Sequence, residues 1–400
     1  MTFLFEDFSL DVPSRELRRG AERIALEPQV FDLLVYLVEN HDRVVSRDDL
    51  IASVWGGRIV SESTLASRIN AVRHALGDDG QAQRLVRTVM RKGVRFVGEV
   101  ASAAPHPATQ GGGPGRSPPG GTDMTQSVTF CRTADGVHLA LACTGAGPPL
   151  VKAANWLNHV EFDRESPVWS PFIDMLSSHC RLLRYDARGN GLSDWDVEDI
   201  SFKTFVRDLE TVVDAAGLER FALLGMSQGA AVSIAYATRH PERVSKLILI
   251  GGFAQGWRRI CSKEEIAQRE ALEGLIRLGW GRDNPAFRQV FTSLFIPGGT
   301  PEQMRWFNNL QRISTSPDNA LRIFRALADI DVLPLLPRVQ APTLVLHSRG
   351  DARIPFSQGL ALAHGIPDAR FVALDSDNHV ILSHEPAWQR LSSEIRTFLA

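Results

Sequence analysis

The chain has 400 residues, of which 44% are apolar and 22% are charged, and its formal net charge is −2. These values are typical of soluble globular proteins and exclude a fibrous or fully disordered chain. No apolar run reaches the length of about 18 residues that would indicate a membrane helix. The four scattered cysteines favour neither a disulfide framework nor a zinc site, which predicts a reducing, cytoplasmic compartment and no metal.

Residues 1–100 are predicted to form a small α+β domain. The acidic start, MTFLFEDFSL, lacks the basic segment of a signal peptide and is typical of a short strand. Apolar residues at helical spacing follow Pro28, from Val30 to Val38, and a second helix is expected to start near Ser46. The remaining expected elements are a third helix over 62–76 and two β-like runs, 85–89 and 95–97, around a turn at 91–93.

Charge is divided unevenly within this domain. Residues 1–57 contain 6 basic and 11 acidic residues, and residues 58–97 contain 8 and 3, so the two parts carry −5 and +5. The positive charge therefore lies on the third helix and on the hairpin that follows it. A helix fits the major groove of DNA, and a basic hairpin beside it can contact phosphates. The alternative interpretation is a basic face that is only solvated.

The order of strands, three helices and a basic wing resembles the winged-helix domain of OmpR/PhoB response regulators and of CadC-type activators. The matching stretches are LEPQVFDLLVYLVEN, VVSRDDLIASVW, STLASRINAVRHALGDDG and LVRTVMRKGVRFVG. The resemblance implies double-stranded DNA as a partner and a homodimer on repeated half-sites. The wing differs from the family pattern, because Met90 stands where a basic residue is frequent and Val94 where tyrosine is usual. The implied DNA contacts are Ser63, Thr64, Ser67, Arg68, Asn70 and Arg73 on the helix, and Thr88, Arg91, Lys92 and Arg95 on the wing.

Phosphorylation of an attached receiver domain is not the evident switch for this module, because no such domain precedes it in the sequence. A segment rich in glycine and proline follows instead. Residues 101–122 include six Gly and five Pro and almost no apolar side chains, so the segment cannot bury enough surface to order itself. We therefore expect a flexible linker over 101–125.

Residues 126–400 are predicted to form one large α/β domain. Apolar strand-like runs alternate with helical segments, which indicates a mostly parallel sheet covered by helices on both faces. No glycine-rich phosphate loop occurs in either domain, so we expect no nucleotide or other cofactor. The predicted strands are Leu182–Tyr185, Phe221–Leu224, Leu247–Ile250, Thr343–His347 and Arg370–Leu374.

The motif Gly225-Met226-Ser227-Gln228-Gly229 lies between a predicted strand and a predicted helix. A serine in G-x-S-x-G at such a junction is typical of a nucleophile held on a strained turn. The serine hydroxyl needs a neighbouring base, and the expected chain order is serine, acid, histidine. Asp351 follows the strand after the motif, and His379 lies in a loop after the next strand. We therefore predict a triad of Ser227, Asp351 and His379, with Asp375, Asp377 and His384 as rivals.

These motifs, together with RYDARGNGLSD and RHPERVSKLILIGG, resemble the α/β-hydrolase superfamily over about residues 128–400. The resemblance implies an oxyanion hole of two backbone N–H groups, one from Gln228 and the other from the segment 152–159. That segment lacks the usual His-Gly pair, and Trp156 is the candidate in it. An insertion at about 254–335 is predicted to be a helical lid, whose aromatic residues serve mostly the core and partly an apolar binding site.

The fold class predicted from the sequence is thus multidomain, a winged helix followed by an α/β-hydrolase domain with a helical lid. The function predicted is that of a DNA-binding transcriptional regulator that binds and hydrolyses a small ester, lactone or amide. Two alternatives stay open. The hydrolase domain could sense an effector without catalysis, or the winged helix could serve only assembly of an esterase.

Overall fold

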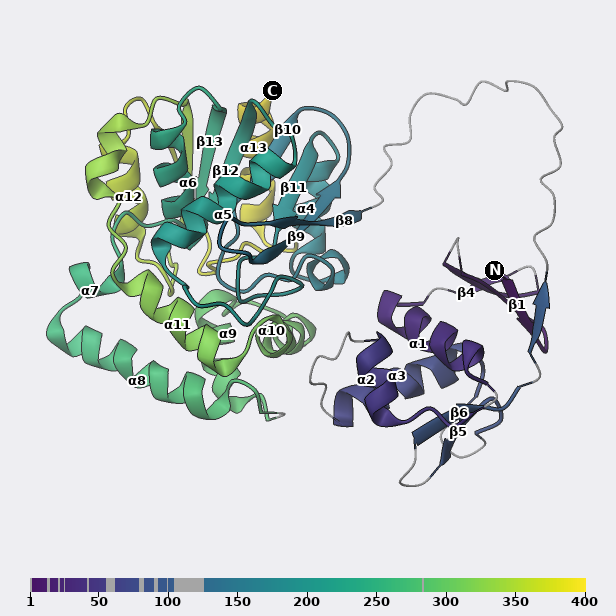
Figure 1. Cartoon of the computed structure of the whole chain (residues 1–400). Coiled ribbons are helices and arrows are strands. Elements are labelled where there is room, and N and C mark those ends of the chain that lie inside the picture. The colour runs from purple at the N-terminus through teal and green to yellow at the C-terminus, as the bar shows by residue number, and fades with distance from the viewer. Residues whose placement is uncertain are drawn as a thin grey trace, which may run out of the picture. The chain divides into compact units, whose positions relative to one another are not determined.

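The structure, a computed structural model, describes residues 2–12, 15–20, 22–24, 26–41, 43–54, 62–78, 83–89, 93–98, 100–103, 126–282 and 284–400. The chain divides into two compact units, Met1–Ser117 and Pro118–Ala400 (Figure 1). The division falls within the predicted linker, of which residues 104–125 lie outside the described part.

A five-stranded antiparallel sheet opens the N-terminal unit, in the order β4-β3-β2-β1-β7. Its last strand comes from beyond residue 100, since Ala101 pairs with Leu4 and Ala103 with Thr2. The N-terminal domain therefore reaches past its predicted end, into residues that the composition assigned to the linker. The strands are β1 (Thr2–Phe5), β2 (Phe8–Asp11), β3 (Glu16–Arg19), β4 (Glu22–Ile24) and β7 (Ala101–Ala103).

Three helices and a two-stranded hairpin complete this unit. The apolar residues of the third helix, Leu65, Ile69 and Val72, are buried as the periodicity predicts. The hairpin is joined to the start of the second helix, because Val45 and Val94 exchange backbone hydrogen bonds. The elements are α1 (Pro28–Glu39), α2 (Arg47–Val54), α3 (Glu62–Ala75), β5 (Val86–Val89) and β6 (Gly93–Phe96).

The C-terminal unit is built on an eight-stranded sheet in the order β15-β14-β13-β12-β10-β11-β9-β8. Strand β9 is antiparallel to both of its neighbours, β8 and β11, and the six strands from β10 to β15 are parallel to one another. The predicted strands and the mostly parallel sheet are confirmed. The strands are β8 (Ser127–Arg132), β9 (His138–Thr144), β10 (Pro149–Lys152), β11 (Arg181–Tyr185), β12 (Phe221–Met226), β13 (Val244–Ile250), β14 (Thr343–Ser348) and β15 (Arg370–Leu374).

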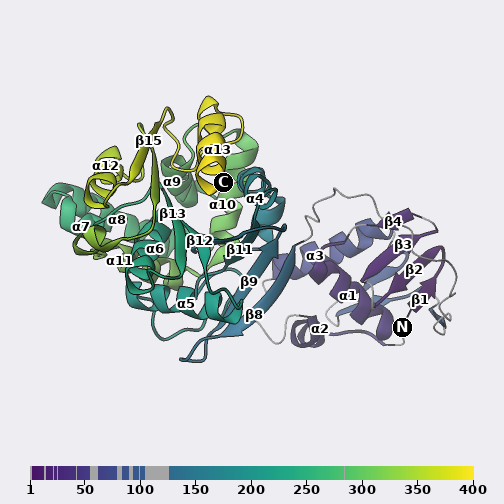
Figure 2. The same cartoon turned by 90° about the horizontal axis from the view of Figure 1, so that it is seen from above.

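Helices cover both faces of this sheet. Figure 2 shows α4 and α13 on one face, and α5 and α6 on the other. Strand β12 is buried along its whole length, which explains why its sequence is continuously apolar rather than alternating. The helices outside the insertion are η1 (Phe162–Glu165), α4 (Ser170–Ser177), α5 (Phe202–Ala215), α6 (Gln228–Arg239), η2 (Leu333–Arg338), α12 (Phe356–Gly365) and α13 (Pro386–Leu399).

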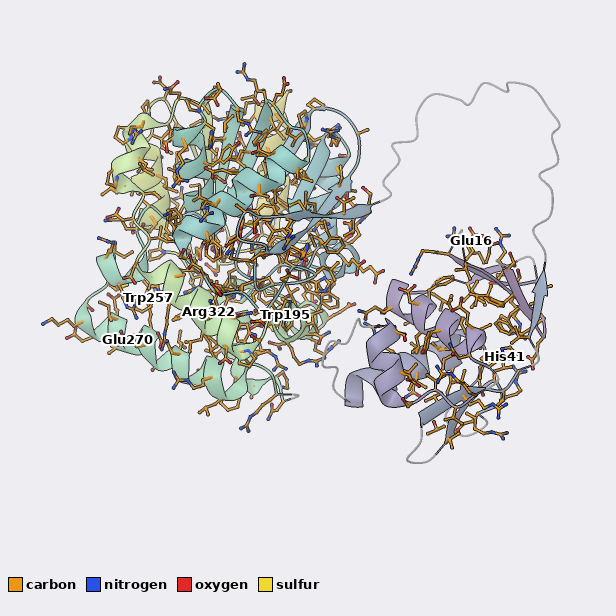
Figure 3. All side chains as sticks on the ribbon, viewed as in Figure 1. Glu16, His41, Trp195, Trp257, Glu270 and Arg322 are labelled. Carbon is orange, nitrogen blue, oxygen red and sulfur yellow. The ribbon has the colours of Figure 1, made fainter. Side chains whose placement is uncertain are left out.

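The insertion after β13 folds as helices across one end of the sheet (Figure 1). Arg322 ties this layer to the body, because its guanidinium donates to the carbonyl oxygens of Val197 (2.8 Å) and Glu198 (2.6 Å), near Trp195 (Figure 3). Within the described residues, no helix is both long and apolar enough to cross a membrane. The helices of the layer are α7 (Trp257–Ile260), α8 (Lys263–Gly279), α9 (Ala286–Phe295), α10 (Pro301–Ser314) and α11 (Pro317–Ala328).

Candidate functional site

Ser227 lies on the turn between β12 and α6, in a backbone conformation that is unusual for a residue with a side chain. Its φ is 53° and its ψ is −124°. Such strain persists only where the surroundings hold it, and it occurs preferentially at functional sites. Gly225 makes the turn possible, because a Cβ there would lie 2.4 Å from the carbonyl oxygen of Gly229. The strand-turn-helix setting predicted for this serine is therefore present.

Asp351 and His379 form a buried pair beside the neighbouring strand ends. The Nδ1 of His379 lies 2.7 Å from Oδ2 of Asp351, and both side chains are 1% exposed. The other carboxylate oxygen, Oδ1, accepts hydrogen bonds from the backbone N–H groups of Arg353 (2.8 Å) and Ile354 (2.9 Å). Burial alone would raise the pKa of Asp351, but His379 and these hydrogen bonds outweigh it and lower the pKa. The carboxylate is therefore held in its charged form.

The serine and the histidine lie at adjoining strand ends. The Ser227 N–H donates to the carbonyl oxygen of Ile250 (2.9 Å), and the next residue, Gly251, borders the histidine, since a Cβ there would lie 3.1 Å from Cε1 of His379. The Nε2 of His379 is buried, and no group among the described residues, Ser227 included, forms a hydrogen bond with it. Catalytic hydrogen bonds are often open in the absence of substrate, and this nitrogen is the one that a general base would use.

The rivals to these residues are at the surface. Asp375, Asp377 and His384 are all exposed. A different histidine, His347, was not predicted from the sequence and is fully buried on β14. Its Nε2 lies 3.0 Å from the carbonyl oxygen of Ile354 and 3.5 Å from Oδ2 of Asp351. Burial lowers the pKa of His347, so it stays neutral beside the carboxylate. Its position four residues before Asp351 was the available signal.

A narrow cavity adjoins Ser227 beneath the lid. It has about 30 Å³ of free volume, which is room for one or two water molecules. Of the aromatic residues in the lid insertion, Trp257 and Phe295 line the cavity, whereas Trp280, Phe291 and Phe307 are buried away from it. The remaining lining residues are Trp156, Phe253, Gln255, Ile260, Arg269, Leu327, Arg353, Ile354, Pro355 and Gln358.

Of the two residues expected to supply an oxyanion hole, Gln228 directly follows Ser227, and Trp156 lines the same cavity as the serine. Gln228 is the first residue of α6, where a helix leaves N–H groups without intrahelical partners. Among the described residues, neither the Gln228 nor the Trp156 N–H donates a hydrogen bond to a backbone carbonyl oxygen. Helix α6 approaches the loop after β10 closely, since a Cβ on Gly229 would lie 3.0 Å from the Ala154 carbonyl oxygen.

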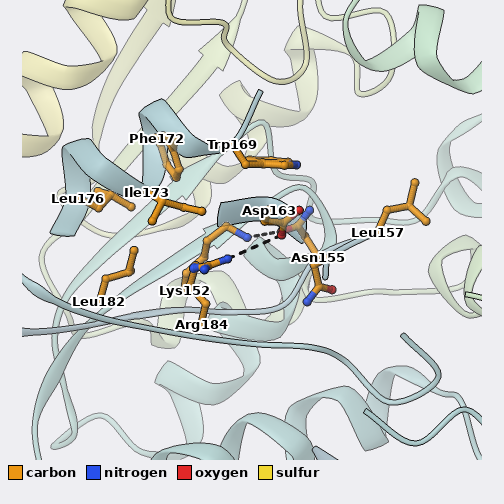
Figure 4. Close-up of a pocket in the computed structure, with 11 residues that line it drawn as sticks. Lys152, Asn155, Leu157, Asp163, Trp169, Phe172, Ile173, Leu176, Leu182 and Arg184 are labelled. Carbon is orange, nitrogen blue, oxygen red and sulfur yellow. Dashed lines mark hydrogen bonds and ion pairs between the residues drawn. The ribbon is translucent and has the colours of Figure 1, made fainter. Parts of the chain in front are cut away.

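Buried charges support the loop that carries Trp156. Lys152, at the end of β10, donates to Oδ1 of Asn155, and Arg184 lies 3.8 Å from Asp163 (Figure 4). Burial lowers the pKa of Lys152 and raises that of Asp163. The neighbouring void has about 10 Å³ of free volume, too little for a ligand. These buried polar groups thus stabilise the loop within residues 152–159, the segment in which the His-Gly pair is missing.

The predicted DNA-contacting residues of the N-terminal unit fall into several groups. Asn70, Thr88 and Arg95 are exposed, and Arg68 is partly exposed and paired with Glu27. Two of the predicted contacts, Arg91 and Lys92, lie outside the described residues. The side chains of three others, Ser63, Thr64 and Ser67, are also outside the described part.

Arg73 does not have the exposed position that the sequence analysis gave it. It is 6% exposed. Its guanidinium donates to the Val86 carbonyl oxygen (3.0 Å), the Thr88 hydroxyl (2.7 Å) and Oδ1 of Asn70 (3.2 Å). Arg73 therefore joins helix α3 to the wing, and its guanidinium is engaged inside the domain rather than presented to a ligand.

Two further arginines stand out on the wing. Arg87 on β5 and Arg95 on β6 are direct cross-strand partners, and both are exposed. Like charges directly opposite each other destabilise a strand pair. The arrangement therefore costs stability in isolation, and an anionic partner would offset that cost. The sequence analysis did not include Arg87, although its alternation with the buried Val86 was visible.

Comparison with known proteins identifies the family of each unit. A family profile described as the alpha/beta hydrolase fold matches residues 164–386. The chain belongs to the alpha/beta hydrolase fold family. A second profile, described as the C-terminal domain of transcriptional regulatory proteins, matches residues 21–96. The N-terminal unit of this alpha/beta hydrolase is therefore a winged-helix DNA-binding domain of the OmpR/PhoB type, and both predicted resemblances are confirmed.

Relatives of the hydrolase unit include enzymes and solved structures. The chain is 27% identical to the AB hydrolase superfamily protein YisY of Bacillus subtilis, over 67% of this chain and 98% of that protein. It is 30% identical to a 2-hydroxy-6-oxo-6-phenylhexa-2,4-dienoate hydrolase of Comamonas testosteroni, over 52% of this chain and 73% of that protein. A hydrolase of known structure from Pseudomonas aeruginosa is 25% identical, with a TM-score of 0.57 over 68% of this chain and 98% of that one.

Proposed function

We propose that this protein is a DNA-binding transcriptional regulator whose alpha/beta hydrolase domain cleaves a small ester, lactone or amide. The observation that carries the catalytic part is the strained turn at Ser227, which adjoins the buried Asp351–His379 pair. The cavity beside the serine is narrow and largely apolar, so a substrate enters only when lid residues such as Trp257 and Phe295 move.

The proposed reaction is acyl transfer to Ser227. The Nε2 of His379 takes the hydroxyl proton while the serine oxygen bonds to the substrate carbonyl carbon, and the backbone N–H groups of Gln228 and Trp156 hold the resulting oxyanion. The histidine then gives the proton to the leaving alcohol or amine. Water, activated by the same histidine, releases the acyl group. Asp351 orients the imidazole and stabilises its protonated form.

The catalytic proposal predicts a covalent adduct on Ser227. A fluorophosphonate probe is expected to label the full-length chain at this residue, because the reagent captures a serine activated by a neighbouring base. Intact-mass and peptide mass spectrometry measure the adduct. The control is Ser233→Ala, another buried serine, on α6, which keeps the label, whereas Ser227→Ala loses it. Absence of labelling in the unmodified chain would contradict catalysis.

The regulatory proposal rests on the winged helix and on its exposed cross-strand arginines, with double-stranded DNA as the partner. A single winged helix contacts a short site, so we propose that a homodimer binds repeated half-sites. Helix α3 supplies the base contacts, through residues that include Arg68 and Asn70. Arg95 and Arg87 contact phosphates.

Replacing Arg87 with glutamine is expected to weaken binding to every DNA sequence alike. The slope of log affinity against log salt should fall by about 0.9, because one fewer phosphate is neutralised. Fluorescence anisotropy with a random-sequence duplex, titrated with salt, measures that slope. Arg23→Gln is the matched control, since Arg23 is exposed on β4 beside acidic residues. A slope unchanged by Arg87→Gln but altered by Arg23→Gln would contradict this placement.

Two other functions are distinguished by the same measurements. A non-catalytic sensor would give no adduct on Ser227, yet its DNA affinity would change with a ligand of the hydrolase domain. An esterase that uses the winged helix only for assembly would be labelled and would bind no DNA at moderate salt. The paired exposed arginines of the wing favour DNA binding over that second alternative.

A further inference from the structure

The cavity beside Ser227 contains a buried cation that the proposed catalytic steps do not use. Arg353 follows Asp351 by two residues and is 7% exposed. Its guanidinium stacks over the rings of Phe295 (5.6 Å) and Phe324 (5.9 Å), and no described residue gives it a hydrogen bond or an ion pair. Arginines buried to this degree are almost always paired with an acidic group.

The surroundings of Arg353 add positive charge rather than neutralising it. Arg269, on lid helix α8, lines the same cavity and has no ion-pair partner among the described residues. The lining includes no aspartate or glutamate. The nearest acid that acts on Arg353 is Asp351, whose oxygens are already bonded to His379 and to backbone N–H groups. Two cations therefore border a space that contains the candidate nucleophile and no counter-charge.

We propose that Arg353, assisted by Arg269, forms a subsite for a carboxylate carried by the substrate. The substrate class is then a small ester, lactone or amide with a free carboxylate, which the planar guanidinium binds through two parallel hydrogen bonds. This inference deepens the proposed function and rests on it. Arg269 lies on the lid, and Arg353 lies in the loop that contains Asp351. A bound carboxylate would therefore contact both the lid and this loop.

The electrostatics of the empty cavity support this assignment. Burial, with the like charge of Arg269, lowers the pKa of Arg353 to about 10. The charged form is thus held at a cost in the free protein. A bound carboxylate would repay that cost and would displace only a few water molecules from a cavity of about 30 Å³. The rings of Phe295 and Phe324 are apolar neighbours that offer the guanidinium N–H groups no acceptor, so these groups are left for a ligand.

The test compares two esters that differ only in a terminal carboxylate, 4-nitrophenyl hydrogen glutarate and 4-nitrophenyl pentanoate. The ratio of their kcat/KM values is measured with the full-length chain. Arg353→Gln is expected to lower the ratio at least about tenfold, since one partner of a buried charge pair is lost. Arg353→Lys, which keeps the positive charge, should retain part of the preference for the ester with the carboxylate. Arg349→Gln, an exposed arginine of the same loop, should leave it unchanged.

A binding measurement separates this inference from the catalytic proposal. The Ser227→Ala chain is titrated by calorimetry with methyl hydrogen glutarate and with dimethyl glutarate. Binding of only the free carboxylate, lost in Ser227→Ala/Arg353→Gln, supports the subsite even if no ester is cleaved and no adduct forms. Equal binding of both compounds, or carboxylate binding that survives Arg353→Gln in a chain with unchanged circular dichroism, overturns it. Failure of both compounds to bind, together with an ester ratio that Arg353→Gln leaves unchanged, overturns it as well.

Discussion

Replacing Asp351 with asparagine is expected to lower kcat for ester hydrolysis about 10⁴-fold, the loss found when the orienting aspartate of a serine protease is changed in this way. The carboxylate lies 2.7 Å from Nδ1 of His379 and fixes the tautomer that leaves Nε2 free to take a proton. An amide cannot stabilise the imidazolium, and its NH₂ group favours the wrong tautomer. Initial rates with 4-nitrophenyl esters measure the effect.

Asp375→Asn is the matched control for this prediction. Asp375 is also a loop carboxylate near His379 in the sequence, but it is exposed. Its replacement is expected to change kcat less than about twofold, in line with the small effects of surface changes. Circular dichroism of both variants checks the fold. A loss in Asp375→Asn that equals the loss in Asp351→Asn would contradict the role proposed for Asp351.

The sharp turn at the candidate nucleophile could be predicted from the sequence, because its motif has a mechanical reason. The G-x-S-x-G sequence must lie on a sharp strand-to-helix turn, so its location in the fold followed from the sequence, as did that of an acid after a parallel strand. Asp351, preferred in the sequence because it follows a strand, is buried, whereas its rivals Asp375 and Asp377 are exposed. His347 was missed because a histidine within an apolar strand has no sequence signal beyond its spacing from the acid.

The winged helix shows where helical periodicity was insufficient. The periodicity placed Leu65, Ile69 and Val72 on the buried face, and the structure agrees. Arg73 lies on the flank of that face, where the wing, not the helix, decides its environment. Its contacts with Val86 and Thr88 join residues 13 and 15 positions apart, which a pattern within one helix cannot predict. The same holds for β7, whose residues pair with β1 at the other end of the domain.

Replacing Arg188 with methionine is expected to lower the free energy of unfolding of the hydrolase unit by about 3–5 kcal/mol, as when one partner of a buried ion pair is removed. Arg188 is 1% exposed and donates through Nε and Nη2 to both carboxylate oxygens of Asp208 (2.8 and 2.6 Å). It also donates to Asp135 (2.8 Å). The change leaves the Asp208 carboxylate buried without its counter-charge.

Urea unfolding of the full chain, followed by tryptophan fluorescence, measures this loss, because tryptophans such as Trp169 and Trp257 lie within the hydrolase unit. The double variant Arg188→Met/Asp208→Leu should recover most of it, since a well-packed apolar pair costs no desolvation of charge. Arg207→Met, which removes an exposed arginine from the same helix as Asp208, should change stability by less than about 0.5 kcal/mol. If the double variant is no more stable than Arg188→Met, the loss arises from packing of the loop after β11 rather than from the orphaned carboxylate. In that case the Arg188–Asp208 ion pair is not what stabilises the hydrolase unit at this position.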